Sequence, residues 1–132
     1  MRSMGSSQKN TVIQAGSFTS CPQVPANSLD YLFIDPPFGS NLMYSELNYI
    51  WDCWLGIKTE TRHEAIENRT QSKSGNEYRA LLKRCFSEAF RILKPGRWMT
   101  IEFSNTSAEV WNSIQTALQE SGFVVANVSA LV

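Results

Sequence analysis

The sequence has few of the residues that hold metals or form disulfides. It contains one histidine, His63, and three cysteines, Cys21, Cys53 and Cys85. No two cysteines have the close spacing typical of zinc sites, and an odd number cannot complete a disulfide framework. We therefore predict no metal site and no disulfides, with reduced cysteines and Cys85 in the core.

An excess of charge of one sign and a long apolar segment are also absent. Lysine plus arginine and aspartate plus glutamate number 12 each, so the formal net charge is zero. A neutral total gives no global basic field for nucleic acid but leaves a local patch open. No apolar run approaches the roughly 20 residues of a membrane helix, and residues 1–10 lack a signal-peptide core. These absences favour a cytoplasmic protein without a membrane partner.

The composition that remains is typical of one compact domain. The chain has 132 residues, of which 42% are hydrophobic, which suffices for one core of modest size. We expect a flexible N-terminus over residues 1–10, a single domain over 11–132, and no internal repeat.

Two short segments in the first third of the chain indicate strands. Residues 11–16 form a short apolar run ending in glycine, and residues 29–34 have the apolar, aromatic and β-branched content of a buried strand. Two prolines follow the second strand, and because they cannot continue its hydrogen bonds the chain must leave the sheet there. Open α/β sheets bind ligands beyond the carboxyl ends of their strands, so Asp35 and Phe38 are expected at the functional edge.

The middle of the chain predicts a helix and then a mobile polar insertion. Residues 41–55 mix apolar and polar residues in a pattern that favours a helix across the functional edge. Residues 58–76 carry only Ala65 and Ile66 as apolar content, which predicts a mobile excursion. Its basic residues are candidates for phosphate contacts, and a solvated loop is the alternative. These residues are Arg62, Arg69 and Lys73.

The clearest helix runs from Tyr78 to Leu93, where apolar residues recur with i, i+3, i+4, i+7 spacing. Pro95 and Gly96 follow and are expected to stop it. A strand is expected at residues 98–103.

The last part of the chain predicts one more helix and one more strand. Thr106 and Glu109 have the spacing of a capping box, Gly122 is a C-terminal stop, and residues 123–128 indicate a strand. The order of elements predicts an α/β fold with a mostly parallel sheet, flanking helices and right-handed crossovers.

The tetrapeptide Asp35-Pro36-Pro37-Phe38 after an apolar strand resembles the catalytic motif of S-adenosylmethionine-dependent methyltransferases that modify the exocyclic amino groups of adenine or cytosine. The resemblance extends over residues 28–41, 44–48 and 51–56. Residues 91–96 are similar to the Leu-Lys-Pro-Gly-Gly turn of these enzymes. The resemblance covers most of the chain and implies a partial Rossmann-like methyltransferase fold.

The resemblance also implies a role for each residue of the motif. An aryl amine is a poor nucleophile because its lone pair is delocalised into the ring. The Asp35 carboxylate and the Pro36 carbonyl would accept the two amine hydrogens, with Pro37 completing the rigid turn. The Phe38 ring would stack on a base taken out of its helix. Asn41 and Tyr44, just downstream, are expected to contact the nucleic acid.

Part of the cofactor site of the family is missing. Gly16 and Ser17 stand where the family has Gly-Asp beside the adenine of S-adenosylmethionine, so a backbone or hydroxyl contact or a plain turn are both open. Asp35 would also lie beside the cofactor. The sequence has no Gly-x-Gly loop. One methyltransferase class places the catalytic strand first, so we expect an N-terminal portion or truncated form, completed by a complementary chain or dimer mate.

Three functional classes remain open from the sequence. The first is a DNA adenine or cytosine amino-methyltransferase. The second is an RNA amino-methyltransferase acting on rRNA or tRNA, because enzymes of that kind share the tetrapeptide. The third is a non-catalytic remnant or interaction module.

Overall fold

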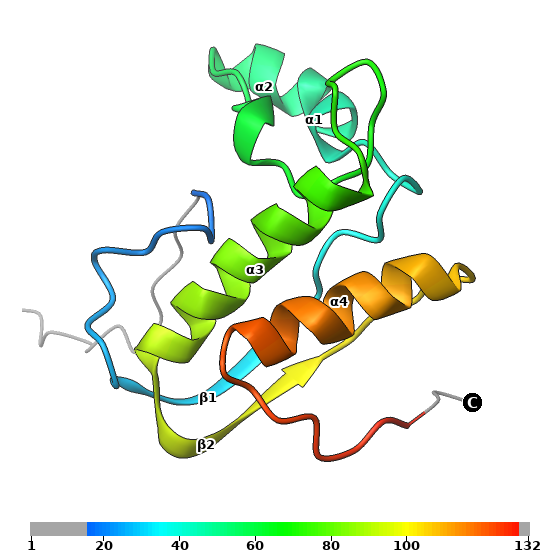
Figure 1. The fold of residues 1–132 in the computed structure, drawn as a ribbon. Coiled ribbons are helices and arrows are strands. Elements are labelled where there is room, and N and C mark those ends of the chain that lie inside the picture. The colour runs from blue at the N-terminus through cyan, green and yellow to red at the C-terminus, as the bar shows by residue number, and fades with distance from the viewer. Residues whose placement is uncertain (1–15, 130–132) are drawn as a thin grey trace, which may run out of the picture.

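A computed structural model of the chain describes residues 16–129. Its elements are β1 (Leu29–Ile34), α1 (Tyr44–Leu47), α2 (Tyr49–Leu55), the 3-10 helix η1 (Thr61–His63), α3 (Gly75–Ile92), β2 (Leu93–Ile101) and α4 (Ala108–Glu120). β1 and β2 pair in parallel as a two-stranded sheet, and α3 and α4 lie side by side over it (Figure 1). The α/β class with a parallel sheet and flanking helices is therefore confirmed. The strand expected at residues 11–16 lies outside the described residues except for Gly16.

The sheet has one covered face and one exposed face. Side chains alternate along a strand, so Ile34 and Ile101 pack against the helices whereas Phe33 is exposed on the opposite face. On that exposed face the Tyr31 hydroxyl hydrogen-bonds to the Thr100 hydroxyl, with 2.6 Å between the oxygens. One face of the sheet thus packs apolar side chains against the helices, and the other face exposes aromatic side chains to solvent.

α3 supplies the largest share of the core because its apolar residues repeat with the period of a helix. Tyr78, Leu82, Phe86 and Ile92 on this stripe are at most 1% exposed. The first three of these residues share a core cluster with the buried stripe of α4, which consists of Val110, Ile114, Ala117 and Leu118. The helix predicted from this periodicity is confirmed. No helix within residues 16–129 is long and apolar enough to cross a membrane.

α3 begins before the first residue of its apolar stripe because it has its own capping box. The Asn76 N–H donates to the Ser74 hydroxyl (3.3 Å), and the Ser74 N–H donates to the Glu77 carboxylate (3.0 Å). These bonds satisfy backbone donors that have no partner within the helix. Gly75 therefore becomes the first helical residue.

The capping box expected for the last helix is wrong. α4 begins after Ser107, not after Thr106, and the Ser107 side chain makes no capping bond. The Ser107 N–H instead donates to the side-chain oxygen of Asn105 (2.7 Å). Asn105 thus binds the backbone of the N-cap residue, and the expected pairing of Thr106 with Glu109 does not arise.

The turn at Pro95 and Gly96 lies inside a strand. α3 ends at Ile92, and β2 begins at once with Leu93, so the proline is not what ends the helix. The register of β1 shifts between its first and third residues, opposite an irregular stretch in which Gly96 has φ +73. A bulge of this kind accommodates a proline in a strand.

Two other expected elements differ in the structure. The helix predicted over residues 41–55 is divided into α1 and α2, which meet at Asn48. Residues 123–128 form no strand among the described residues. After Gly122 the Phe123 N–H returns to the Leu118 carbonyl (3.1 Å), and Val124 is 89% exposed. A strand needs a neighbouring backbone for its hydrogen bonds, and no backbone hydrogen bond among the described residues joins 123–128 to β1 or β2.

The polar segment 58–76 packs more closely than its composition predicts. It contains η1 and an antiparallel bridge between Asn68 and Lys73. Its two apolar residues, Ala65 and Ile66, are buried. The mobility of the segment remains a prediction.

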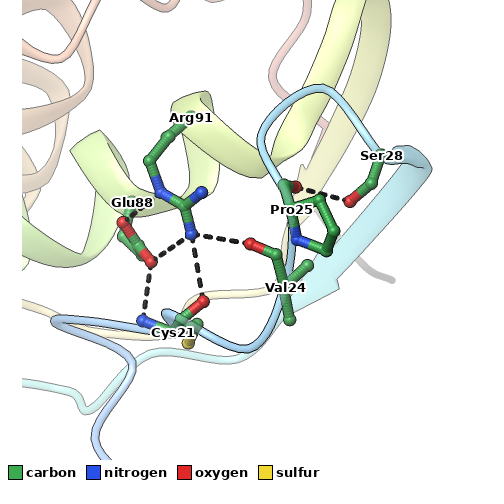
Figure 2. Close-up of polar contacts among 6 residues, drawn as sticks. All are labelled: Cys21, Val24, Pro25, Ser28, Glu88 and Arg91. Carbon is green, nitrogen blue, oxygen red and sulfur yellow. Dashed lines mark hydrogen bonds and ion pairs between the residues drawn. The ribbon is translucent and has the colours of Figure 1, made fainter.

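Arg91, in the last turn of α3, holds the amino-terminal end of the sheet. Its guanidinium donates to the Glu88 carboxylate (2.7 Å) and to the carbonyls of Cys21 (3.0 Å) and Val24 (2.9 Å), as Figure 2 shows. Glu88 also accepts the Cys21 N–H (2.6 Å). The hydrogen bonds from Arg91 lower the pKa of Glu88 to about 2. This network fastens the segment that leads into β1.

Candidate functional site

The Asp35-Pro36-Pro37-Phe38 tetrapeptide leaves the sheet at the carboxyl end of β1. The last ladder bond runs from the Glu102 N–H to the Ile34 carbonyl (3.0 Å). The prolines that follow have no N–H to extend the ladder. Asp35 therefore stands at the edge where open α/β sheets bind ligands.

Two side chains fix the backbone of the tetrapeptide from opposite sides. The Tyr78 hydroxyl donates to the Pro37 carbonyl (2.7 Å), and the side-chain NH₂ of Asn105 donates to the Phe38 carbonyl (2.9 Å). Tyr78 comes from α3, and Asn105 from the loop between β2 and α4. Because Tyr78 is fully buried, its position is set by the core.

Asn105 is itself held on three sides. Its side-chain oxygen accepts the Ser107 N–H (2.7 Å), and its carbonyl accepts the indole N–H of Trp111 (2.8 Å). Its NH₂ is left to bind the Phe38 carbonyl. Through Asn105, the turn before α4 thus fixes the tetrapeptide relative to that helix.

Gly39 allows the chain after the tetrapeptide to pass close to α4. Its φ is +72, and a Cβ placed on it would lie 3.3 Å from a methyl group of Val110. A side chain here would have to adopt a left-handed backbone and displace a core residue. The Gly39 carbonyl accepts the Glu67 N–H (3.1 Å), which joins the 58–76 segment to the site.

Two acceptors of the tetrapeptide have no partner within residues 16–129. Asp35 is exposed, and no hydrogen bond or ion pair reaches its carboxylate from the described residues. No hydrogen bond from those residues reaches the carbonyl of Pro36, which is a buried residue. The two carbonyls that follow are both occupied. The tetrapeptide therefore offers one carboxylate and one adjacent carbonyl as acceptors.

Tyr44 lies near enough to Asp35 to feel the charge of its carboxylate. It is the first residue of α1 and is half-buried. Its burial and, as a smaller cause, the charge of Asp35 raise the pKa of its hydroxyl. Of the residues expected to contact nucleic acid, Tyr44 is the one that the structure brings to Asp35.

The Phe38 ring belongs to an aromatic cluster. Its centroid lies 5.3 Å from that of Phe103 at an angle of 79°, and Phe103 is 5.1 Å from Trp111 at 89°. Edge-to-face contacts of this kind are favourable for aromatic pairs. Phe38 is half-buried, so the cluster fixes the ring while part of it stays accessible.

The expected phosphate contact of Lys73 is wrong. Its side chain is buried, and its ammonium group donates to the carbonyls of Thr61 and Glu64 (2.5 Å for Glu64). Burial lowers the pKa of Lys73. A buried ammonium group needs hydrogen-bond acceptors, and here they are backbone carbonyls of the same segment. Lys73 therefore stabilises the fold of residues 58–76.

The remaining candidates for nucleic-acid contact lie on the surface and share no hydrogen bond among the described residues. Arg62 is paired with Glu60 (2.9 Å), and both side chains are exposed. Asn41 and Arg69 are exposed. No hydrogen bond among residues 16–129 links any of these three residues to Asp35.

Gly16 and Ser17 are not brought to the Asp35 edge by any hydrogen bond among the described residues. The Ser17 hydroxyl bonds to Thr19 (2.9 Å). The loop that they begin is fastened through Cys21 to the last turn of α3, which precedes the amino-terminal end of the sheet. Their predicted contact with a cofactor has no support in this geometry.

Two clefts lie outside the tetrapeptide. One of about 310 Å³ lies between α1, α2 and residues 58–61, and one of about 550 Å³ lies between the start of α3 and α4. No residue of the tetrapeptide lines either cleft. Within residues 16–129, no group of three or more histidine, cysteine or acidic side chains is placed to hold a metal.

Comparisons with known proteins add no relative to this description. No protein-family model matches the chain, and no curated protein or solved structure matches it significantly. The chemistry of the site therefore rests on its own residues.

Sequence reasoning missed the positioning roles of Tyr78 and Asn105. Tyr78 lies on the apolar stripe of α3, where only its hydroxyl distinguishes it from a core phenylalanine. A buried tyrosine usually finds a hydrogen-bond partner, and that was the available signal. Asn105 follows a predicted strand and precedes a helix, but its link to residue 38 spans 67 positions.

Proposed function

We propose that this chain supplies the amine-holding part of an S-adenosylmethionine-dependent methyltransferase that acts on an exocyclic amino group of adenine or cytosine in DNA. The proposal includes a partial Rossmann-like fold in which β1 is the catalytic strand. One observation carries it. At the carboxyl end of β1 the Asp35 carboxylate and the Pro36 carbonyl have no partner among the described residues, while Tyr78 and Asn105 occupy the two carbonyls that follow.

The amine chemistry follows from these acceptors. An exocyclic amine has two hydrogens, and accepting both draws the nitrogen towards tetrahedral geometry and frees its lone pair. Acceptors that are already fixed stabilise the charge that develops on the amine at little cost in reorganisation. Asp35 would take one hydrogen and Pro36 the other, while the Phe38 ring would support a base extruded from its helix.

S-adenosylmethionine would supply the methyl group as a sulfonium. The residues described here do not fit its whole binding site, because the sequence has no Gly-x-Gly loop and Gly16 and Ser17 are fastened elsewhere. This chain would therefore hold the base, and a complementary chain of different sequence would supply the cofactor loop, which a second copy of this chain lacks as well. The chain alone should bind S-adenosylmethionine weakly or not at all in a calorimetric titration.

RNA is the second candidate substrate, because a guanine, adenine or cytosine amine in RNA presents the same two hydrogens. The described residues place no basic cluster at Asp35 that would favour either nucleic acid. The test is transfer of labelled methyl groups to single-stranded DNA and RNA oligonucleotides. It compares the chain alone with the chain mixed with a protein that carries the glycine loop.

We expect transfer in the mixture, and its substrate separates DNA from RNA. No transfer and no cofactor binding in either sample would favour the third class, a non-catalytic interaction module.

A further inference from the structure

Helix α2 and its flanks carry an apolar surface that the rest of the described chain leaves uncovered. In Figure 1, α1 and α2 lie beyond the amino-terminal end of α3, away from the sheet. Trp54 is 83% exposed, Leu55 70%, and Tyr49 and Trp51 67% each. We call this surface the α2 patch. It consists of Leu47, Tyr49, Ile50, Trp51, Trp54, Leu55 and Ile57.

The α2 patch departs from the usual pattern of a surface helix. Surface helices have a polar face towards solvent, and a helix that is apolar all round is normally buried. The only charged residue between positions 47 and 57 is Asp52. Asp52 is buried, and its carboxylate accepts the Thr59 N–H (2.7 Å), so it points into the protein. All outward positions of the helix are therefore apolar, aromatic or cysteine.

The exposed area of the α2 patch approaches that of one side of a stable interface. Its three aromatic side chains expose on the order of 400 Å² of apolar surface. With four aliphatic residues the patch approaches the roughly 800 Å² per partner of a standard protein interface. A patch of this size on a soluble protein marks an interaction site.

We propose that the α2 patch is the self-association surface of this protein, which pairs it with a second copy of the same chain. Two observations favour a second copy as the occupant. The patch has no exposed charge, so copies meeting through it do not repel each other and no oppositely charged partner is selected. The formal net charge of the chain is zero, so no long-range repulsion opposes the encounter.

A twofold arrangement fits this surface. In an isologous dimer the same patch is used on both subunits, and apolar residues are complementary to themselves. Aromatic residues, tryptophan and tyrosine above all, are enriched at the centres of such interfaces. This inference is independent of the proposed methyl transfer, because no catalytic residue lies in the patch.

The test is the mass of the protein in solution, measured by light scattering over a range of concentration. The test variant carries Trp51→Lys and Trp54→Lys, which places like charges on both facing surfaces. The matched control is Trp98→Lys, which changes a tryptophan that is 65% exposed on the sheet. We expect wild type and the control to be dimers, and the double variant to be a monomer with an unchanged circular dichroism spectrum.

If the double variant does not fold, Ile50→Lys with Leu55→Lys asks the same question, since both side chains are at least 65% exposed. A monomeric wild type throughout the concentration range would overturn the proposal and point to a different protein partner. A dimer that survives charge in the α2 patch would overturn it as well.

Discussion

The two ends of the β1–β2 sheet treat their polar groups differently. At the amino-terminal end, the charged side chains of Arg91 and Glu88 bind each other and the backbone of residues 21 and 24. At the carboxyl end, the backbone is equally well fixed by Tyr78 and Asn105, but the carboxylate of Asp35 has no partner among residues 16–129.

The polar groups at the two ends of the sheet therefore have different roles: one set holds the chain, and the other is open to a ligand. A carboxylate whose oxygens accept hydrogen bonds from the protein contributes to holding the chain. A charge that acts on a ligand has to keep its acceptors open while its position is fixed. The amino-terminal end has the first character and the carboxyl end has the second.

The largest expected effect is that of Asp35→Ala on methyl transfer by the chain mixed with the protein that carries the glycine loop. Removing one fixed group that acts mainly in the transition state lowers kcat by roughly 10²–10³-fold. Cofactor affinity should change much less, which transfer kinetics and a binding titration separate. Asp30→Ala is the matched control, because Asp30 is an exposed aspartate on the same strand that is paired with Lys94. Near wild-type turnover of Asp35→Ala would show that the tetrapeptide is only a structural turn and takes no part in methyl transfer.

The hydrogen bond from Tyr78 to the Pro37 carbonyl predicts that Tyr78→Phe lowers the free energy of unfolding. The substitution removes the donor to the Pro37 carbonyl at a partly buried position, which costs about 1 kcal/mol. Tyr31→Phe is the control, because its hydroxyl bond to Thr100 lies on the exposed face and should cost less. Urea unfolding of the two variants measures the difference. Equal effects would mean that the Tyr78 hydrogen bond does not contribute more than a surface hydrogen bond.

The Arg91–Glu88 pair at the amino-terminal end of the sheet predicts that the stability of the fold depends on pH. Hydrogen bonds from Arg91 lower the pKa of Glu88 to about 2 from the ordinary value of 4.5. A depressed carboxyl pKa contributes stability above the unfolded value, and this contribution is lost as pH falls from about 4.5 towards 2. Unfolding midpoints measured across that window should fall more steeply for wild type than for Glu88→Gln. Parallel curves would show that the Arg91 network does not couple to folding.

Part of this architecture could be predicted from the sequence because it depends on local pattern. The stripe of α3 and the apolar run of β1 followed by two prolines have short-range signals, and both elements form. The pairing of Tyr78 with Pro37 and of Asn105 with Phe38 depends on contacts between distant positions, which periodicity does not contain. Lys73 was misassigned because a lysine in a polar segment is usually solvated, whereas here backbone carbonyls replace the water.

A smaller expected effect concerns segment 58–76, which combines polar composition with a few fixed contacts. The amides of Asn68 and Lys73 bond to each other's carbonyls (2.9 Å each) and should exchange more slowly than the rest of the segment. The segment as a whole should exchange faster than the core of α3, because about half of its residues are exposed whereas the core of α3 is buried. Hydrogen exchange resolved by residue tests this order. Uniformly slow exchange over 58–76 would show that composition misjudged its mobility.

The most direct test of the central claim is whether the open acceptors recognise both hydrogens of an amine. The measurement is an NMR titration of the chain with adenosine and cytidine, and with the analogues whose amine carries two methyl groups in place of its hydrogens. We predict shifts at Asp35, Phe38 and Tyr44 with the natural nucleosides, and loss of these shifts with the dimethylated analogues. Equal shifts with both kinds of ligand, or none at these residues with either, would contradict the account.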